Sequence, residues 1–297
     1  MHIVYVSDGK AGHRSQAIGL YRAIQRQYRY DVSFQEIDLS ELTWLQILSG
    51  ILSKKMDLFR QTPGMIIGVG SHTQSRVLAL GKIYPKAKTI ILMKPNFPFA
   101  WFDHVVIPAH DGIAEKGNVI LTQGALNPIS NEERHQHGRI LIALGGSSKH
   151  HVWNDEKVLS ALESITQNHM DQNIILTTSR RTPKAFLAQL EAQPYAKNLQ
   201  IFPVEETPQG WIFEEMQKAE AVWVTEDSVS MLYEALTAGC KVGVIAINRL
   251  KEDRITRSVD LLLEQKKVSQ GYQLSELENQ AALQEADLVA FKVLHEN

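Results

Sequence analysis

Short β-branched runs alternate with segments of helical periodicity along nearly the whole chain of 297 residues. Strands that alternate with helices are joined by crossover connections, so they form parallel sheets covered on both faces. This pattern predicts an α/β fold. It excludes solenoids and disordered arrays, because no repeat with a period of about 20 to 50 residues and no low-complexity stretch is present.

In the first half of the chain, six apolar runs are separated by three longer helical segments. We expect strands at about residues 2–7, 31–37, 65–69, 89–93, 104–107 and 118–121, and helices at about residues 15–28, 42–59 and 73–84. Residues 124–138 hold an Asn-Pro pair and the polar run EERHQHG, with almost nothing to bury. We expect a linker there.

A second series of strands and helices follows this segment. Strands are expected at ILIALGG, NIILTTS, LQIFP, AVWVT and KVGVIAI, and helices at about residues 155–168, after Pro183, after Pro208 and from Ser228. The chain is therefore expected to form two similar domains, residues 1–130 and 131–297. The tail, residues 275–296, is helix-prone, and its apolar side chains Leu277, Ala281, Leu288 and Phe291 are expected to pack back onto one of the domains. The N-terminal domain is the one we consider.

Composition limits the partners and the compartment. Lys plus Arg number 31 against 33 Asp plus Glu, so the net charge of −2 gives no overall positive field for nucleic acid, and we expect no nucleic-acid partner. A single cysteine, Cys240, excludes an intrachain disulfide. No apolar run resembles a signal sequence or approaches the roughly 18 residues of a membrane span, so the expected location is cytoplasmic.

The turn after the first strand reads SDGKAGHRSQ, at the sheet edge where open α/β folds bind ligands. Gly9 and Gly12 permit close backbone approach, and Ser15 is expected to cap the following helix. Asp8 and His13 are the candidates for proton transfer. Lys10 and Gln16 are expected on the acceptor side. A capped turn whose glycines serve geometry alone is the alternative.

A similar turn, GVGSHT, follows the strand MIIGV. It supplies Ser71, His72 and Thr73, which we expect to line the acceptor side of a site. An ordinary helix start explains the same residues.

Two turns of the second half carry groups suited to a diphosphate. In LGGSSKHH, Gly145 and Gly146 leave their backbone amides accessible beside Ser147 and Lys149. The sequence is not a lysine-bearing Walker loop. In SRRTP, Ser179 is followed by Arg180 and Arg181, and guanidinium groups match phosphate oxygens. Ordinary strand-to-helix turns and solvated charges are the alternatives.

The segment VTEDSVSMLYEAL places Glu226 and Glu234 eight residues apart, around the start of a helix. A carboxylate at a sheet edge is well placed for ribose hydroxyls. Asp227 or Ser228 could equally cap the helix, and Glu234 could be solvated.

Several motifs are absent from the sequence. It contains no Asp-x-Asp triplet, no His-Glu-x-x-His and no Gly-x-Ser-x-Gly. A carboxylate-held divalent metal, a zinc hydrolase and an α/β-hydrolase are therefore disfavoured, and we expect no metal site and no cofactor.

These motifs together resemble those of the mitochondrial-fission "elongated mitochondria" family, whose bacterial members are described as glycosyltransferases. The matching stretches run in order from Asp8 to about Val242: DGKAGHRSQ, GVGSHT, IPAHD, LGGSSKHH, SRRTP and VTEDSVSMLYEAL. The spacing of Glu226 and Glu234 is also similar to the donor-binding signature of two-domain nucleotide-sugar glycosyltransferases. Those enzymes often have a G-x-G-L stretch between the two glutamates, where this chain has DSVSMLY.

The resemblance implies the GT-B architecture: two Rossmann-like α/β domains facing a cleft, an acceptor-side domain at residues 1–130 and a nucleotide-sugar-binding domain at residues 131–297. It implies metal independence. The residues it assigns to the donor are Glu234 for the ribose hydroxyls, Ser228, Ser230 and Met231 for the diphosphate at the helix start, and Gly145 to Lys149 with Arg180 for the rest.

The expected reaction is transfer of a sugar from a nucleoside-diphosphate sugar to a hydroxyl of a glycan or glycolipid acceptor, such as a lipopolysaccharide core or a lipid-linked saccharide. Asp8 is the first choice of base for an inverting enzyme, and His13 is the second. A non-catalytic division scaffold and a nucleotide-sugar epimerase are the alternatives.

An apolar helix around Trp44 and the run NFPFAWF raise the question of a membrane contact. Lys54, Lys55 and Arg60 follow the helix, so both segments could rest peripherally on an inner-membrane surface. Burial in the core explains the same residues and is the interpretation we favour.

Overall fold

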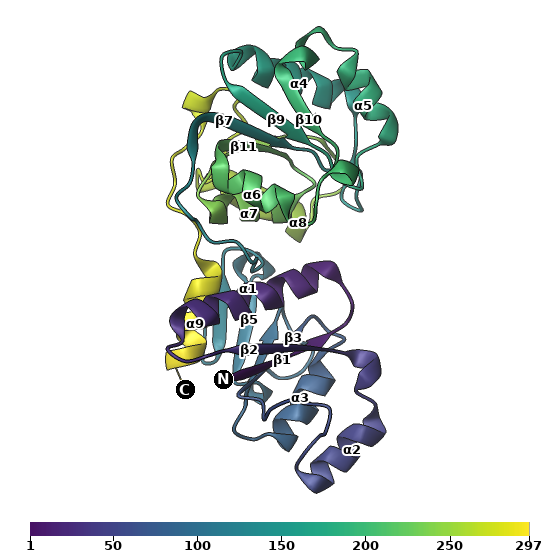
Figure 1. The fold of residues 1–297 in the computed structure, drawn as a ribbon, viewed down its shortest axis with the longest axis vertical. Coiled ribbons are helices and arrows are strands. Elements are labelled where there is room, and N and C mark those ends of the chain that lie inside the picture. The colour runs from purple at the N-terminus through teal and green to yellow at the C-terminus, as the bar shows by residue number, and fades with distance from the viewer. Residues whose placement is uncertain (297) are drawn as a thin grey trace. The chain divides into compact units, whose positions relative to one another are not determined.

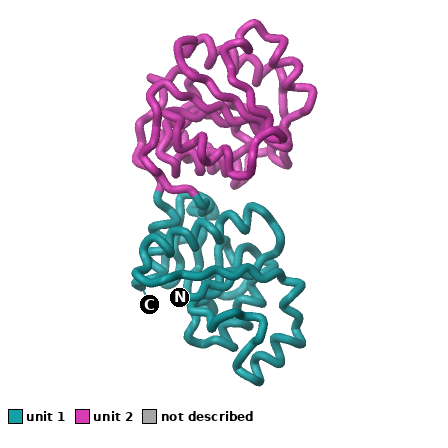
Figure 2. Tube along the Cα trace, in the orientation of Figure 1, with its two compact units in different colours: residues 1–128, 284–297 teal, residues 129–283 magenta. Residues whose placement is uncertain are grey.

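The computed structural model describes residues 1–296. The chain divides into two compact units (Figure 2). Unit 1 comprises residues 1–128 and the C-terminal segment from Gln284, and unit 2 comprises residues 129–283. Each unit is built on its own parallel sheet with helices on both faces (Figure 1).

Unit 1 contains a six-stranded sheet in the order β2-β1-β3-β4-β5-β6. Every neighbouring pair is parallel. The strands are β1 (His2–Ser7), β2 (Ser33–Asp38), β3 (Met65–Val69), β4 (Lys88–Leu92), β5 (His104–Pro108) and β6 (Val119–Thr122). The helices are α1 (Ala11–Gln27), α2 (Trp44–Ser53), α3 (Gln74–Ile83) and α9 (Glu285–His295).

Both faces of this sheet are apolar because the central strand β1 is buried at all six positions. Ile3 and Tyr5 pack with α1 and α9, whereas Val4 and Val6, which point the other way, pack with α2 and α3. Successive side chains of a strand alternate between faces, so a continuous apolar run fills two cores. Strand β1 is thereby packed on both faces directly before the loop that follows it.

Unit 2 contains a five-stranded sheet in the order β10-β9-β7-β11-β12, again parallel throughout. Its strands are β7 (Gln136–Ala143), β9 (Asn173–Thr177), β10 (Leu199–Phe202), β11 (Ala219–Thr225) and β12 (Lys241–Ile245), and β8 (His151–Val152) and β13 (Asn248–Arg249) form a separate antiparallel pair. The helices are α4 (Asp155–Asn168), α5 (Lys184–Glu191), α6 (Trp211–Lys218), α7 (Val229–Ala238) and α8 (Arg254–Glu264).

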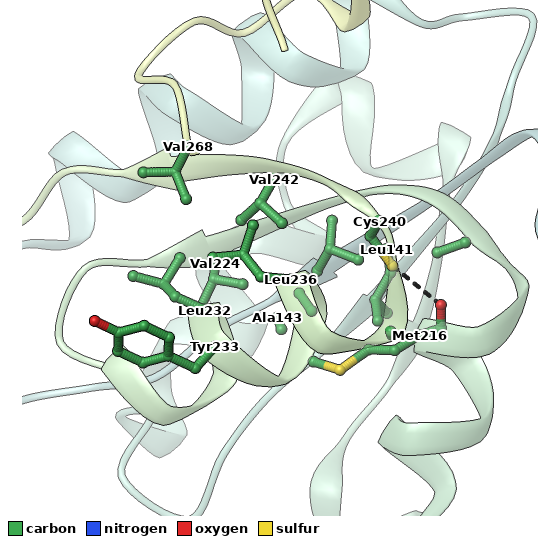
Figure 3. Close-up of a cluster of buried hydrophobic side chains, with 14 of the residues drawn as sticks. Leu141, Ala143, Met216, Val224, Leu232, Tyr233, Leu236, Cys240, Val242 and Val268 are labelled. Atoms are coloured by element: carbon green, nitrogen blue, oxygen red, sulfur yellow. Dashed lines mark hydrogen bonds between the residues drawn. The ribbon is translucent and has the colours of Figure 1, made fainter. Parts of the chain in front are cut away.

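One of the two cores of unit 2 lies between its sheet and helices α6, α7 and α8 (Figure 3). Leu141 and Ala143 of β7 reach this core, while Ile140 and Ile142 reach the opposite one with α4 and α5. Burial raises the pKa of the Cys240 thiol to about 12. The thiol donates to the carbonyl of Met216 at 3.1 Å, so this cysteine is a packing residue.

The C-terminal helix α9 belongs to unit 1 and packs on α1. The prediction that Leu277, Ala281, Leu288 and Phe291 form the packing face of the tail was wrong. Leu288 and Phe291 are exposed, and Leu277 lies in a core of unit 2. The buried face of α9 is instead formed by Ala286, Val289, Ala290 and Val293.

The helix predicted at residues 42–59 is shorter and spans Trp44–Ser53, two other elements begin at different residues from those predicted, and one helix was not predicted. Strand β7 begins at Gln136, inside the segment predicted as a linker. Helix α1 begins at Ala11, so Ser15 lies within the helix and does not cap it. Helix α8 was not predicted at all.

Candidate functional site

The two sheets each have one point at which the strand order reverses. In unit 1 the chain adds β2 on one side of β1 and then returns to add β3 on the other side. The loops that leave β1 and β3 therefore diverge and open a crevice at the carboxyl edge of the sheet, where open α/β folds bind ligands. These loops hold Asp8 to Lys10 and Gly70 to Thr73.

A carboxylate and an imidazole are paired at this crevice. Nδ1 of His13 lies 2.9 Å and 3.1 Å from the two carboxylate oxygens of Asp8. The Asp8 side chain is 5% exposed and that of His13 is 15% exposed. A carboxylate only accepts hydrogen bonds, so Nδ1 donates and Nε2 is left as the basic nitrogen. No residue in the described part of the chain bonds to Nε2.

Lys10 completes this arrangement. Its Nζ donates to Oδ2 of Asp8 at 2.8 Å. Burial disfavours the charged form of Asp8, but the hydrogen bonds from Lys10 and His13 outweigh that effect and hold the pKa of Asp8 below its ordinary value. The carboxylate therefore stays ionised and can orient the imidazole.

Gly70 lies directly against the His13 ring. Its φ is +74°, and a Cβ at this position would lie 2.6 Å from Cε1 of His13. Glycine adopts positive φ without steric cost and leaves room for the ring. The loop after β3 thus lies in close contact with the imidazole that Asp8 orients.

The other residues predicted for the acceptor side lie around the same edge. Ser71 and His72 are exposed and Gln16 is partly buried. Thr73 is buried, and its hydroxyl donates to the carbonyls of Val69 and Gly70 at 3.2 Å, so it stabilises the loop. Gly12 lies in the first turn of α1 with open space around it.

Two further residues at this edge, His110 and Asp111, were not predicted as site residues from the sequence. His110 and Asp111 follow β5, and both side chains are mostly buried. The His110 ring nitrogen Nε2 lies 3.9 Å from Oδ1 of Asp111. Their position could have been inferred from the motif IPAHD, which is a strand end like the others.

In unit 2 the strand order reverses between β7 and β11. The loops after these strands are tied together. The amide of Gly145 donates to Oγ1 of Thr225 at 2.7 Å, and that of Gly146 donates to Oδ2 of Asp227 at 3.0 Å. A Cβ on Gly145 would overlap the side chains of Asp227 and Ser228. The two glycines are therefore needed for this close packing, and their amides are used within the protein.

The arginine pair after β9 divides its roles. Arg181 forms an ion pair with Asp227 at 2.7 Å and donates to the carbonyl of Gly146 at 3.2 Å. It joins three loops at the sheet edge. Arg180 is exposed and has no polar partner among residues 1–296. Ser179 donates to the carbonyl of Gly145 at 3.1 Å and belongs to the same framework.

Ser147 and Lys149 show the same contrast between a residue bonded within the protein and an exposed one without a partner in the part of the chain that the structure describes. The hydroxyl of Ser147 accepts from the amide of Trp153 at 3.1 Å, which closes the loop after β7. Lys149 is exposed, and the described residues offer it no ion-pair partner. The cationic groups open to a ligand at this edge thus include Lys149 and Arg180.

Helix α7 begins at the reversal point itself. Ser228 precedes the helix but makes no capping hydrogen bond with its side chain. The first amides of the helix therefore remain available at the positive end of its dipole. Ser230 is exposed there and Met231 is partly buried.

Glu234 lies in the middle of α7 and is strongly desolvated. Burial raises its pKa to about 8. Its carboxyl group has no hydrogen bond or ion pair within the described residues. A desolvated carboxyl without a protein partner is a candidate for ligand binding.

Glu226 lies in the interior instead. Its side chain is 3% exposed, and it accepts from Nε of Arg249 at 2.6 Å. Arg249 also bonds to Asp260 at 2.6 Å. This network joins the end of β11 to β13 and α8, so Glu226 stabilises the edge from within.

Residues 1–296 contain no group of three or more His, Cys, Asp or Glu side chains placed to hold a metal ion. The groups at the two reversal points are hydroxyls, amides, cationic side chains, and an imidazole and an arginine that are each paired with one carboxylate.

The architecture and these edges define a class: a two-domain α/β protein with a Rossmann-like sheet in each domain, of the GT-B type. Residues 11–296 match the family described as mitochondrial fission ELM1, and the chain belongs to that family. It is also 23% identical over 291 residues to the uncharacterized protein RP120 of Rickettsia prowazekii (strain Madrid E), with 80% of this chain and 81% of that protein covered.

Two solved structures share the fold. The UDP-GlcNAc 2-epimerase of Methanocaldococcus jannaschii has a TM-score of 0.52 and 11% identity over 99% of this chain and 100% of that chain. Phytolacca americana UGT2, in complex with UDP-2fluoro-glucose and pterostilbene, has a TM-score of 0.50 and 10% identity over 98% of this chain and 89% of that chain. The family and the fold class predicted from the sequence are thus confirmed.

Proposed function

We propose that this protein is a metal-independent glycosyltransferase that moves a sugar from a nucleoside-diphosphate sugar to a hydroxyl of a glycan or glycolipid acceptor, such as a lipopolysaccharide core or a lipid-linked saccharide. The observation that carries the proposal is the largely buried Asp8–His13 pair at the carboxyl edge of the unit 1 sheet. An attacking hydroxyl must lose its proton, and an imidazole oriented by a buried carboxylate is well suited to accept it.

In this proposal His13 is the base and Asp8 is the residue that positions it. Nε2 of His13 takes the proton as the acceptor oxygen bonds to the sugar carbon and the bond from that carbon to the diphosphate breaks. Asp8 stabilises the resulting imidazolium. Asp8 itself is a weak base because its pKa is lowered, which is why we reverse the order assigned from the sequence.

The donor is proposed to bind unit 2 at the start of α7. The free amides of the helix, with Lys149 and Arg180 at the same sheet edge, would hold the charge that grows on the departing diphosphate. Glu234 would accept hydrogen bonds from the ribose hydroxyls, which replaces the contacts that its carboxyl group lacks.

The two similar structures support a donor of this class. One is a UDP-GlcNAc 2-epimerase, and the other was solved in complex with UDP-2fluoro-glucose. UDP-GlcNAc and UDP-2fluoro-glucose are both nucleotide sugars. The sequence contributes the second line of support, because it lacks the Asp-x-Asp triplet that would hold a divalent ion on the diphosphate.

A thermal-shift panel of uridine, guanosine, cytidine and adenosine diphosphates and their sugars tests the donor site. We expect one nucleoside to stabilise the protein, by about 2.7 kcal/mol at a concentration of 100 times its Kd. Glu234→Ala should abolish the shift. Glu278→Ala, which changes an exposed glutamate of unit 2, should leave it intact.

A flat response across the panel would contradict the proposal and favour the scaffold. Conversion of the donor to its epimer without any acceptor would also contradict it, and would identify an epimerase.

A further inference from the structure

Helix α2 has an unusual composition for a helix on the surface of unit 1. It is ten residues long, carries no charged side chain, and has Gln46, Ser49 and Ser53 as its only polar residues. Only Ile47 and Gly50 are buried. A helix that is apolar on nearly all sides belongs in a core or at a lipid surface, since water solvates its outer face poorly.

The outer face of α2 exposes five large apolar side chains. Their exposed fractions lie between 40% and 86%. They are Trp44, Leu45, Leu48, Ile51 and Leu52. Single exposed leucines are common in proteins, but five apolar side chains on one short helix form a continuous patch. Burial of this helix in the core, the interpretation favoured from the sequence, was therefore wrong.

The packing of the inner face fixes this orientation. A Cβ on Gly50 would lie 2.8 Å from the Met56 side chain and 2.9 Å from that of Ile83, so α2 rests closely on its neighbours at this point. At the start of the helix the guanidinium of Arg76 stacks 3.9 Å from the Trp44 ring. It also donates to the carbonyl of Leu42 at 3.1 Å. The helix is thus held from below, with the apolar patch outward.

The charges around α2 are arranged like those of helices that lie on anionic membranes. Lys54 and Lys55 follow its last residue, and exposed Arg60 lies slightly further on. One fully exposed carboxylate, Asp57, pairs with Lys55 at 3.2 Å. The acidic side chain of Asp38, before the helix, accepts from the Ser40 amide and hydroxyl and so is used in the preceding turn.

Glu41 is the other acidic residue before α2, and its carboxylate accepts from the Asp38 amide at 3.2 Å. Both acidic residues lie before the start of the helix, whereas the helix itself carries no charge and the segment after it is net positive, with Lys54, Lys55 and Arg60 against Asp57.

We propose that α2 lies flat on the surface of a lipid bilayer that contains anionic lipids. The five apolar side chains enter the boundary between headgroups and acyl chains, and Lys54 and Arg60 contact lipid phosphates. Trp44 at the end of the patch suits the headgroup level, where aromatic rings are enriched. The attachment is peripheral, because no helix within residues 1–296 is long and apolar enough to span a bilayer.

The position of α2 connects this surface with the candidate catalytic edge. Arg76, which holds Trp44, lies in the first turn of α3, directly after the Gly70–Thr73 loop. If the proposed function holds, a membrane-bound α2 brings a lipid-linked acceptor to the edge that carries His13. The membrane contact itself does not depend on the reaction.

Co-sedimentation with vesicles tests the proposal. The full chain is incubated with vesicles of phosphatidylcholine alone or with 30% phosphatidylglycerol, and the bound fraction is measured over a range of lipid concentrations. We expect binding to the anionic vesicles, at least tenfold weaker binding to the neutral ones, and loss of binding as salt rises.

The variant Leu45→Glu/Leu52→Glu changes the two most exposed side chains of the patch, so it should fold normally. We expect it to bind at least tenfold more weakly. The matched control Met170→Glu/Leu250→Glu adds the same charge at two exposed apolar positions of unit 2 and should bind like the wild type. Lys54→Ala/Arg60→Ala should weaken binding to anionic vesicles only.

Three results would overturn the proposal: no binding to either vesicle, equal loss in the control variant, or a dimer in solution that Leu45→Glu/Leu52→Glu dissociates while vesicles remain unbound. The last would identify the patch as an interface between two copies. Sugar transfer to a soluble acceptor that is unaffected by Leu45→Glu/Leu52→Glu leaves the proposed function standing in each case.

Discussion

The ion pair between Glu226 and Arg249 allows a sharp test of what the first glutamate of the Glu226/Glu234 motif does. The Glu226 carboxylate is 3% exposed and lies 2.5 Å from a terminal guanidinium nitrogen of Arg249. The variant Arg249→Met removes that partner and leaves a buried charge. Breaking a buried pair in this way costs about 3–5 kcal/mol. Loss of the contacts of Arg249 with Asp260 and Glu252 adds to this cost, but by less, because those carboxylates are more exposed to water than Glu226.

The double variant Glu226→Met/Arg249→Met should recover most of this loss, because replacing both partners of a buried pair with apolar groups of similar volume is often neutral. Urea denaturation at pH 7, followed by circular dichroism, gives the free energy of unfolding of each variant, and the double-mutant cycle gives the coupling. We expect a coupling of at least about 2 kcal/mol. Arg134→Met, which breaks exposed pairs with Glu132 and Glu214, is the control and should change stability little.

The interior role of Glu226 is refuted if Arg249→Met unfolds at the wild-type urea midpoint. It is also refuted if the double variant is as unstable as the sum of the two single changes. Nucleotide binding separates the alternatives further. If Glu226 contacts the ribose directly, the recovered double variant will fold and fail to bind.

Three other predictions concern single positions. Gly70→Ala should cost about 1–2 kcal/mol of stability for a side chain at positive φ and reduce turnover by more than tenfold, because its Cβ displaces the His13 ring. Gly117→Ala, also at positive φ but with open space around it, should show only the stability loss; equal turnover in the two variants contradicts the role of Gly70. Because the folded protein holds a proton on Glu234 up to about pH 8 whereas an unfolded glutamate releases it near 4.5, wild-type stability should fall by at most about 1.4 kcal/mol per unit as the pH rises through that range. The stability of Glu234→Gln, measured from urea midpoints over the same pH range, should lack this decrease. A decrease that persists in the variant shows that another group titrates. Asp8→Asn, which leaves the imidazole without its ionised partner, should lower kcat more than KM in a donor-turnover assay, and an unchanged kcat would show that Asp8 does not position His13.

The sequence predicted the α/β class and most of the strands because buried parallel strands read as continuous apolar runs. His2–Ser7 and Met65–Val69 were placed at their observed ends for this reason. The start of β7 could not be predicted in this way. Its first residues are polar and exposed, and the segment is held by long-range contacts such as those of the His135 ring with the carbonyls of Ala219 and Ala238.

The helices show a different limit. Glycine near a helix start argues for a turn, so the pattern placed the start of α1 four residues late, although Gly12 lies in the first turn. For α2 the periodicity carries no information on burial, because a helix that is apolar all round has no polar face to point at solvent. Only the structure shows that most of its apolar side chains face outward.

The sequence could predict which strand ends form the candidate site, but it could not predict the role of each residue there. Parallel strands end at one edge, so residues after β1, β3, β7 and β11 had to gather at two edges. Which groups remain open depends on side-chain pairing across loops. Arg181 and Arg180 are neighbours in sequence, yet one is held by Asp227 and the other is exposed. No local pattern distinguishes them.

Donor turnover by the His13→Gln variant tests the central claim most directly. His13 is proposed to accept the proton of the acceptor hydroxyl, while the donor binds unit 2. The wild type, given the stabilising nucleotide sugar and an acceptor extract, should release the nucleoside diphosphate. His13→Gln should lower kcat by at least about 100-fold and leave the donor Kd unchanged, whereas His137→Gln, at an exposed position of unit 2, should behave like the wild type. Wild-type turnover in His13→Gln would contradict the claim.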